Sequence, residues 1–200
     1  MQKRIQVFIG GSTNDSISDA YNTIAIELGK EINKRDYDII FDGCYGLPYL
    51  LFNQIKDTSR AKIWTTKYYS NSYMYLTHSN LCKFDTQTEF TNAISKASDA
   101  MIFMKGNIGT VAEVVHAINA KKNKEHDAPI VLLNVNNEWD DLVNLLNSYQ
   151  LNNLYYITDN FVDALNYVET ELFKENSKFY TLFLSSGNYL NRKNPIIKTK

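Results

Sequence analysis

The stretch AMIFMKGNIGTVAE, residues 100–113, holds the three features that decide the fold: an apolar run, a glycine turn and the start of a helix. Residues 100–104 form an apolar run of the length that a buried strand needs. Apolar residues then recur at helical spacing from Val111 to Ile118, which predicts a helix over residues 110–121. Such a turn is where α/β proteins bind anions, because the free N–H groups and the positive dipole end of the helix face the ligand.

On both sides of this stretch the chain alternates predicted strands and helices. The apolar patterns predict strands over residues 4–9, 37–41, 61–65, 129–133 and 154–157. They predict helices over residues 16–35, 48–56, 87–96, 140–148 and 161–174. This alternation predicts an α/β fold with a mostly parallel sheet flanked by helices.

Two segments lack such a pattern. Residues 66–85 are predicted to form a long loop, whose tyrosines at 68–75 could stack on a base or sugar, pack internally or make a subunit contact. Residues 176–200 form a tail that could be an extra strand, a partner-binding arm or a frayed end. We therefore expect a single domain over residues 1–175.

The composition excludes several classes of function. With 21 Lys and Arg and 22 Asp and Glu, the net charge is −1, which favours neither nucleic acid nor an anionic membrane as a partner. Cys44 and Cys82 belong to no CxxC motif or Cys/His cluster, so neither a metal site nor a disulfide framework is indicated. The apolar run at the start is too short for a signal peptide or a transmembrane helix. We expect a cytoplasmic protein with no cofactor.

Glycine turns follow three of the predicted strands, at residues 10–12, 43–46 and 106–109. The carboxyl ends of parallel strands meet at one edge of a sheet, where open α/β folds bind their ligands. The motifs GxxxxGK[ST], GxGxxG and GxSxG are absent, which argues against a P-loop, a dinucleotide fingerprint and a hydrolase elbow. The candidate substrate-binding residues at this edge are Gly10, Gly11, Ser12, Gly43, Gly46, Lys105, Gly106, Asn107, Gly109 and Thr110.

Glu113 has two compatible interpretations. Thr110 and Glu113 have the spacing of a capping box, in which the hydroxyl and the carboxylate satisfy amides at the helix start. Alternatively, a carboxylate in the first turn of a helix that faces the sheet edge could stabilise positive charge developing on a sugar, or position a water. Glu113 is therefore the candidate catalytic residue.

Several local sequences resemble the LONELY GUY family of cytokinin riboside 5′-monophosphate phosphoribohydrolases, many of whose members were once labelled possible lysine decarboxylases. Residues 105–113 (KGNIGTVAE) match the family's PGGxGTxxE motif at four positions: Gly106, Gly109, Thr110 and Glu113. Residues 42–47 (DGCYGL) resemble its GGG-x-x-GLMG turn in slightly shortened form. Residues 133–135 (LNV), followed by Trp139-Asp140, resemble its LLNV…(Y/W)D. The resemblance covers residues 4–174 and implies a Rossmann-like three-layer sandwich, typically in a homodimer.

The resemblance also implies an activity. Members of the family bind a nucleoside monophosphate at the PGGxGT turn and cleave its N-glycosidic bond to release the free base. Catalysis is attributed to the glutamate of the motif, which is Glu113 here, and to an arginine in a preceding ERK-like segment.

This chain departs from the family pattern at that arginine. Glu89 is kept, but Phe90 occupies the arginine position, and Phe can neither hold a charged substrate nor donate a hydrogen bond. Lys96 and Lys105 are the cations near enough in sequence to compensate. Asp42 stands where the family has glycine, and its charge would oppose a phosphate bound close by.

Three hypotheses follow for the function. The first is a nucleotide N-glycosidase that acts on an adenosine-type 5′-monophosphate. The second is a catalytically impaired or differently specialised binder of a nucleotide or a nucleotide derivative, which the presence of Phe90 and Asp42 motivates. The third is an assembly role through a dimer face that includes the tyrosine-rich segment.

Overall fold

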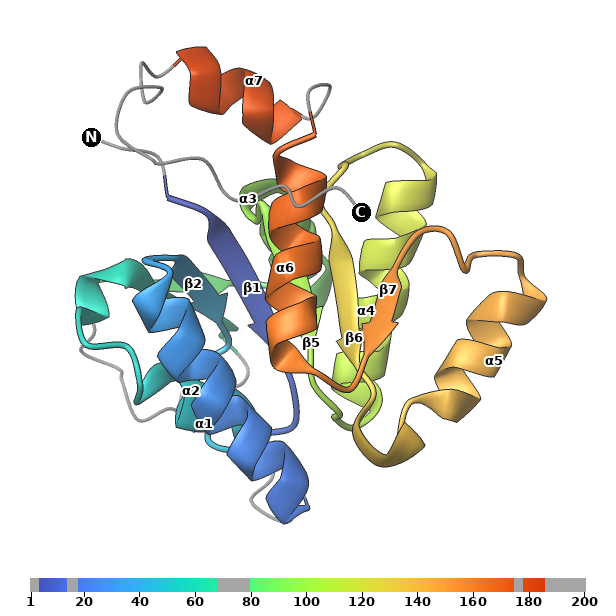
Figure 1. The fold of residues 1–200 in the computed structure, drawn as a ribbon, viewed down its shortest axis with the longest axis horizontal. Coiled ribbons are helices and arrows are strands. Elements are labelled where there is room, and N and C mark those ends of the chain that lie inside the picture. Colours follow the sequence, from blue (N-terminus) through green and yellow to red (C-terminus); the bar gives the residue numbers. More distant parts are fainter. Residues whose placement is uncertain (1–3, 14–17, 68–79, 175–177, 186–200) are drawn as a thin grey trace, which may run out of the picture.

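The computed structural model describes residues 4–13, 18–67, 80–174 and 178–185. Within them lies a seven-stranded sheet in the order β4-β3-β2-β1-β5-β6-β7, in which every neighbouring pair is parallel (Figure 1). The strands are β1 (Gln6–Gly10), β2 (Asp38–Phe41), β3 (Ala61–Thr66), β4 (Leu81–Phe84), β5 (Ala100–Phe103), β6 (Ile130–Leu133) and β7 (Tyr156–Thr158). The order reverses at β1, so the loops after β1 and β5 lie next to each other, as a ligand site at a topological switch point requires.

Helices cover both faces of the sheet. They are α1 (Asp19–Lys34), α2 (Leu47–Phe52), α3 (Gln87–Ala97), α4 (Ile108–Lys122), α5 (Asp140–Ser148), α6 (Phe161–Leu172) and α7 (Lys178–Ser185). Helices α1, α2 and α6 pack on one face, and α3, α4 and α5 contribute to the core on the other (Figure 1). The predicted α/β three-layer sandwich with a parallel sheet is confirmed.

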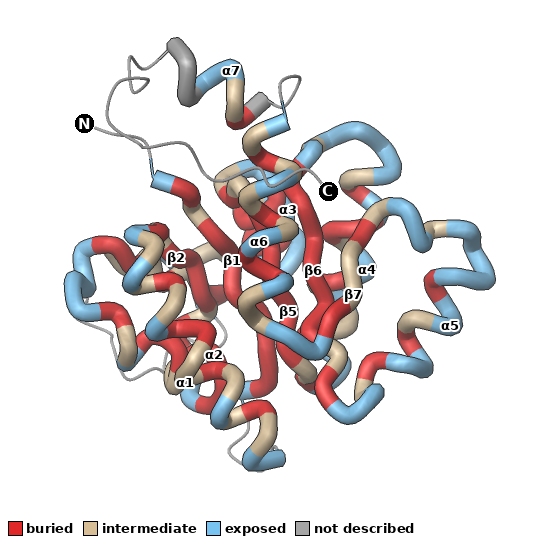
Figure 2. The backbone as a smooth tube through the Cα atoms, in the orientation of Figure 1, coloured by how far each residue is buried: buried red, intermediate tan, exposed pale blue. Residues whose placement is uncertain are grey.

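The core forms on both sides of the central strands because successive side chains point to opposite faces. In β1, Val7 and Ile9 belong to the cluster under α1, whereas Phe8 belongs to the cluster under α3 and α4. All four residues of β5 are buried, which explains its continuous apolar sequence. Figure 2 shows the same pattern, with buried residues along the strands and exposed residues on the outer turns of the helices.

One prediction from the sequence is wrong in its secondary structure, and one alternative left open for the tail is excluded for the residues described. Residues 66–85 are not entirely loop, because β4 pairs with β3 at the edge of the sheet. An edge strand with exposed residues in its middle has no alternating apolar pattern to reveal it. In the tail, residues 178–185 form helix α7 and not an extra strand. The tyrosine-rich stretch 68–75 and the tail beyond residue 185 lie outside the described residues.

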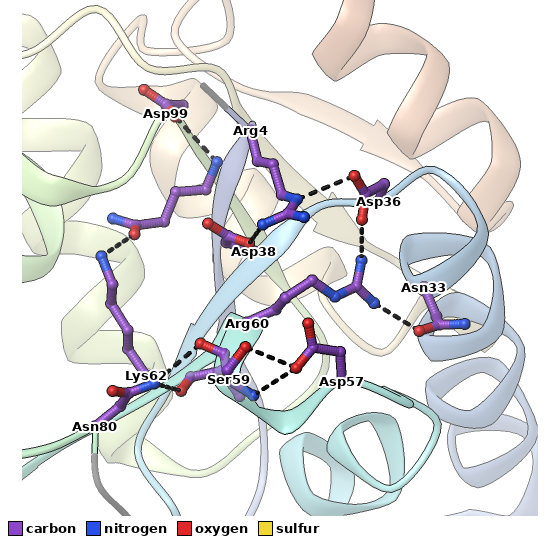
Figure 3. A network of polar contacts seen from close by, with 12 residues as sticks. Arg4, Asn33, Asp36, Asp38, Asp57, Ser59, Arg60, Lys62, Asn80 and Asp99 are labelled. Carbon is purple, nitrogen blue, oxygen red and sulfur yellow. Dashed lines mark hydrogen bonds and ion pairs between the residues drawn. The ribbon is translucent and has the colours of Figure 1, made fainter. Parts of the chain in front are cut away.

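The amino ends of the strands carry a network of paired charges (Figure 3). Arg4 donates from Nε to Asp36 Oδ2 at 3.0 Å, and Arg60 donates from Nη1 to Asp36 Oδ1 at 2.8 Å. Arg60 also donates to the side chain of Asn33, and only 4% of its side chain is exposed. Burial acts to raise the pKa of Asp36, but its hydrogen bonds and charge contacts with Arg4 and Arg60 hold that pKa below its usual value. Asp38, whose Oδ1 lies 3.9 Å from Arg4 Nη1, is less well compensated, because burial raises its pKa.

None of the helices in the described ranges combines the length and the apolar character needed to cross a membrane.

Candidate functional site

A cavity of about 540 Å³ opens at the carboxyl edge of the sheet. It lies among the loops that follow β1, β2, β4 and β5, together with the end of β3 and the first turns of α4. Six of the residues predicted for the site line it: Gly11, Ser12, Asn107, Gly109, Thr110 and Glu113. The location that the glycine turns predict is thus where the described structure has an open cavity.

Main-chain hydrogen bonds hold the loops around this cavity together. The amide of Ser12, after β1, donates to the carbonyl oxygen of Lys105, after β5, at 3.0 Å. The amide of Leu47, after β2, donates to the carbonyl oxygen of Ser12 at 2.9 Å. Ser12 therefore links all three glycine turns through its backbone.

Two glycines allow these loops to approach so closely. Gly46 has a φ of 87°, and a Cβ there would lie 2.8 Å from the carbonyl carbon of Thr13. At Gly106, a Cβ would lie 2.6 Å from the Cβ of Thr110 and 3.0 Å from the amide nitrogen of Ser12. By contrast, a Cβ at Gly109 would meet no atom within 4 Å, so its glycine leaves space in the cavity wall.

Five of the predicted site residues do not line the cavity: Gly10, Gly43, Gly46, Lys105 and Gly106. The four glycines belong to the turns that build the site, in positions where they are packed closely or have a positive φ. The side chain of Lys105 turns elsewhere: its Nζ donates to the carbonyl oxygen of Glu138 and lies 5.0 Å from the centre of the Trp139 ring. Lys105 therefore contributes its backbone to the site, while its charge lies outside the cavity.

The capping box predicted at Thr110 and Glu113 is wrong. Helix α4 begins two residues earlier, at Ile108, with Asn107 as the N-cap, and Thr110 Oγ1 donates to the carbonyl oxygen of Gly11 at 3.3 Å. The shift places Glu113 in the second turn, too far along to reach back to an N-cap amide. Asn107 makes no side-chain cap hydrogen bond, so the first amides of α4 have no capping side chain.

A capping box does occur at the start of α3. The amide of Glu89 donates to Thr86 Oγ1 at 3.1 Å, and Glu89 Oε2 accepts from the amides of Asp85 and Thr86 at 3.0 and 3.2 Å. Glu89 thus stabilises the helix start. Its neighbour Phe90 is 2% exposed and packs edge-on against Phe8, at a centroid distance of 6.3 Å, and against Phe84, at 6.0 Å. The residue at the family's arginine position thus belongs to the core and also lines the cavity.

Two carboxyl groups face the cavity, that of Asp42 from the loop after β2 and that of Glu113 from helix α4. Asp42 follows β2, and its Oδ1 accepts the amide of Cys44 at 3.0 Å. Burial raises the pKa of Asp42 to about 6. Burial, and then the charge of Asp42, raise the pKa of Glu113 to about 8. At neutral pH the pair therefore holds close to one proton, mostly on Glu113.

No lysine, arginine or histidine lines the cavity within the part of the chain that the structure describes. Lys96, the other cation considered as a replacement for the missing arginine, lines a second cavity at the amino edge of the sheet. Lys67, next to the end of β3, forms an ion pair with Asp85 at the surface. The carboxyl groups of Asp42 and Glu113 thus face the cavity without a described cationic side chain in its wall.

Several residues of the cavity wall were not predicted from the sequence. They are supplied by the end of β3 and by the start of α3: Thr65, Thr66, Asp85 and Gln87. Thr66 is 5% exposed, and its hydroxyl has no hydrogen-bond partner among the described residues. One pattern in the sequence could have indicated the residues at the start of α3, because Asp85-Thr86-x-x-Glu89 is typical of a helix start. No local sequence pattern indicated that Thr65 and Thr66 of β3 line the cavity.

The chain matches a family model described as possible lysine decarboxylase over residues 61–171, more than half of its length. Among curated proteins, it is 29% identical to the cytokinin riboside 5′-monophosphate phosphoribohydrolase LOG1 of Arabidopsis thaliana, over 72% of this chain and 68% of that protein. It is 30% identical to the probable cytokinin riboside 5′-monophosphate phosphoribohydrolase LOG6 of the same plant, over 70% of this chain and 71% of that protein.

Solved structures share the fold. A molybdenum cofactor carrier protein from Chlamydomonas reinhardtii superposes with a TM-score of 0.67 at 18% identity, covering 86% of this chain and 100% of that chain. A molybdenum cofactor binding protein from Rippkaea orientalis superposes with a TM-score of 0.64 at 17% identity, covering 85% and 98%. At such identities the likeness concerns the fold alone.

Proposed function

The chain belongs to the LONELY GUY family, whose model is described as possible lysine decarboxylase, and on this premise we propose that it is an N-glycosidase: it hydrolyses the bond between a ribosyl group and a base, and releases the free base. The relatives are named for a riboside 5′-monophosphate, so adenosine 5′-monophosphate (AMP) is the reference substrate. The observation that carries the proposal is Glu113, which faces the carboxyl-edge cavity beside Asp42 and keeps its proton at neutral pH.

The protonated Glu113 suits the first half of such a reaction. As the C1′–N bond breaks, Glu113 donates its proton to the leaving nitrogen of the base. The carboxylate that remains then stabilises the positive charge on the ribosyl ring. One group thereby supplies both the acid and the counter-charge.

Asp42 suits the second half. With a pKa of about 6 it is mostly ionised at neutral pH, so it can accept a proton from the water that attacks C1′. The new C1′–O bond completes the hydrolysis, and the proton passes from Asp42 to Glu113 to restore the starting state. The two roles predict a bell-shaped pH dependence, because activity falls when Asp42 is protonated near pH 6 and when Glu113 loses its proton near pH 8.

The hydroxyls of the cavity wall provide contacts for the sugar. Ser12, Thr65, Thr66 and Thr110 line the cavity, and the hydroxyl of Thr66 has no described partner. The first amides of α4 have no capping side chain and are suited to donate hydrogen bonds to an oxygen of the ligand.

The test is to incubate the protein with AMP or with adenosine and to measure the free base released by chromatography. We expect Glu113→Gln to lower the rate by about a hundredfold or more, because general acid catalysis commonly contributes 10²–10⁴-fold. Asp141→Asn removes an exposed carboxylate from α5 and serves as the matched control, with an unchanged rate. Wild-type protein that releases no more base than Glu113→Gln would refute the proposed activity.

A second candidate function is a binder of a nucleotide derivative without turnover. It is favoured by Phe90, which fills the family's arginine position with an apolar core residue. A nucleotide or nucleoside that raises the melting temperature without releasing base would support this alternative.

We also propose a cytoplasmic homodimer, in line with the family's typical assembly. Light scattering at micromolar concentration tests the dimer, and a monomeric mass would exclude it.

A further inference from the structure

The charges around the carboxyl-edge cavity carry an inference about the substrate, which rests on the proposed N-glycosidase function. We propose that the cavity selects an uncharged nucleoside over its 5′-monophosphate, and that Asp42 is the residue that determines this preference.

The first step is the sign of the charges in the cavity wall. Its ionisable residues among those described are Asp42, Asp85 and Glu113, and all three are acidic. Of these three residues, only Asp85 forms a described ion pair, and its partner is Lys67. A phosphate brought into this cavity would meet carboxyl groups and no cationic side chain of the described wall.

The second step concerns cations elsewhere in the chain. The two lysines considered as replacements for the family's arginine have their side chains elsewhere: Lys105 contacts Glu138 and Trp139, and Lys96 lines the cavity at the opposite edge. Two segments that follow β1 and β3 in the chain, residues 14–17 and 68–79, lie outside the described structure, and their sequences contain no lysine or arginine. The sole basic side chain in these two sequences is that of His78.

The third step is the position of Asp42. It replaces a glycine of the family turn, and its carboxylate is held near the cavity by the amide of Cys44 at 3.0 Å. Its charge acts on Glu113 at the start of α4, where a phosphate would otherwise gain from the helix dipole. The carboxylate of Asp42 therefore opposes the attraction that the free amides of α4 would exert on an anion.

The fourth step is what the wall offers in place of cations. Ser12, Thr65, Thr66 and Thr110 are hydroxyl residues, and all four are at least nine-tenths buried. Thr66 is the unpartnered one, so its hydroxyl is available to a ligand. Neutral hydroxyls match the hydroxyls of an unphosphorylated ribose, including the free 5′-OH, and require no charge on the ligand.

The experiment compares each nucleoside with its own 5′-monophosphate, as adenosine with AMP, inosine with IMP, and cytidine with CMP. We expect kcat/KM of the wild-type protein to be at least tenfold higher for the preferred nucleoside than for its monophosphate. Asp42→Asn keeps the acceptor for the Cys44 amide but removes the charge, so it should shift the ratio of the dissociation constants of adenosine and AMP, measured by titration calorimetry, at least tenfold toward the monophosphate. Asp141→Asn, the matched control, should leave the ratio within twofold.

The outcomes separate this inference from the proposed function. Faster release of base from the monophosphate would overturn the inference and leave the N-glycosidase intact, as would a ratio that Asp42→Asn does not change. If no compound releases base, the N-glycosidase fails, and titration calorimetry with adenosine and AMP then decides the inference. Tighter binding of adenosine would support it, whereas tighter or equal binding of AMP, or binding of neither, would overturn it.

Discussion

Asp36 at the amino edge of the sheet and the pair Asp42 and Glu113 at its carboxyl edge differ in how their charges are compensated. At the amino edge, Arg4 and Arg60 both contact Asp36, and the pKa of that carboxyl is held below its usual value (Figure 3). At the carboxyl edge, Asp42 and Glu113 face a cavity with no cation in its described wall, and burial raises the pKa of each. Asp36 is thus stabilised as an anion at one edge, whereas Asp42 and Glu113 are destabilised as anions at the other.

This difference separates a carboxylate that is paired with arginines from carboxyl groups that are buried without a described cation. A paired carboxylate contributes to folding and has no reason to change its protonation near neutral pH. A desolvated pair with pKa values of about 6 and 8 costs stability and is poised for proton transfer near neutral pH. The carboxyl edge is instead held together by main-chain hydrogen bonds through Ser12 and by closely packed glycines.

The largest effect is expected from breaking the backbone packing of the carboxyl edge. Gly46→Ala forces a side chain into a positive φ and against the Thr13 backbone, and should lower the free energy of unfolding by about 3 kcal/mol or more. Urea unfolding measures the change. Gly109→Ala is the control in the same edge: its Cβ meets nothing, so stability should change by less than about 1 kcal/mol. Equal losses in the two variants would contradict the role assigned to Gly46.

The next effect is expected from the amino edge. Arg60→Met removes a buried guanidinium and its contacts with Asp36 and Asn33, and should cost about 2 kcal/mol, because half of Asp36 remains exposed to water. Lys30→Ala breaks an exposed pair with Glu27 and should change stability by less than about 0.5 kcal/mol. Thermal unfolding of both variants at pH 7 makes the comparison. A loss at Arg60 no larger than at Lys30 would show that the network does not stabilise the fold.

A smaller change in stability is expected at Glu113, where the substitution should stabilise the protein and not destabilise it. The pKa of this group is raised by folding from 4.5 to about 8, so its contribution to stability is greatest below pH 4.5 and decreases as the pH rises toward 8. Glu113→Gln removes that cost and should stabilise the protein by about 1–2 kcal/mol at pH 8, and not at pH 4.5. Urea unfolding at both pH values tests the sign. Destabilisation at pH 8 would mean that the carboxylate is compensated after all.

The smallest effect is expected at Lys105. Its side chain contacts Glu138 and Trp139 and not the cavity, so Lys105→Met should leave the release of base within about twofold and cost at most about 1 kcal/mol through the lost contact with the ring. Kinetics and thermal unfolding of one preparation give both values. A loss of activity of tenfold or more would show that the ammonium group of Lys105 acts in the site.

Most of the fold was predictable from local patterns. Strongly apolar strands such as β5 and β6, and amphipathic helices such as α1 and α6, were predicted to within a few residues. Strand β4 was missed, because an edge strand of four residues is defined by its pairing with β3 and not by its own sequence. The start of α4 was placed two residues late for a similar reason: Thr110 bonds Gly11, a partner 99 residues away, and not the helix end.

Order along the chain was sufficient to predict a parallel α/β sheet and to locate the candidate site at its carboxyl edge, because periodicity and strand–turn–helix order are local properties. The position of Glu113 also followed from its motif. Only the packed structure decides that Asp42 lies near Glu113, that Thr66 enters the wall, and that Lys105 does not. Protonation depends on desolvation and on distances between distant segments, and these quantities exist only once the chain has folded.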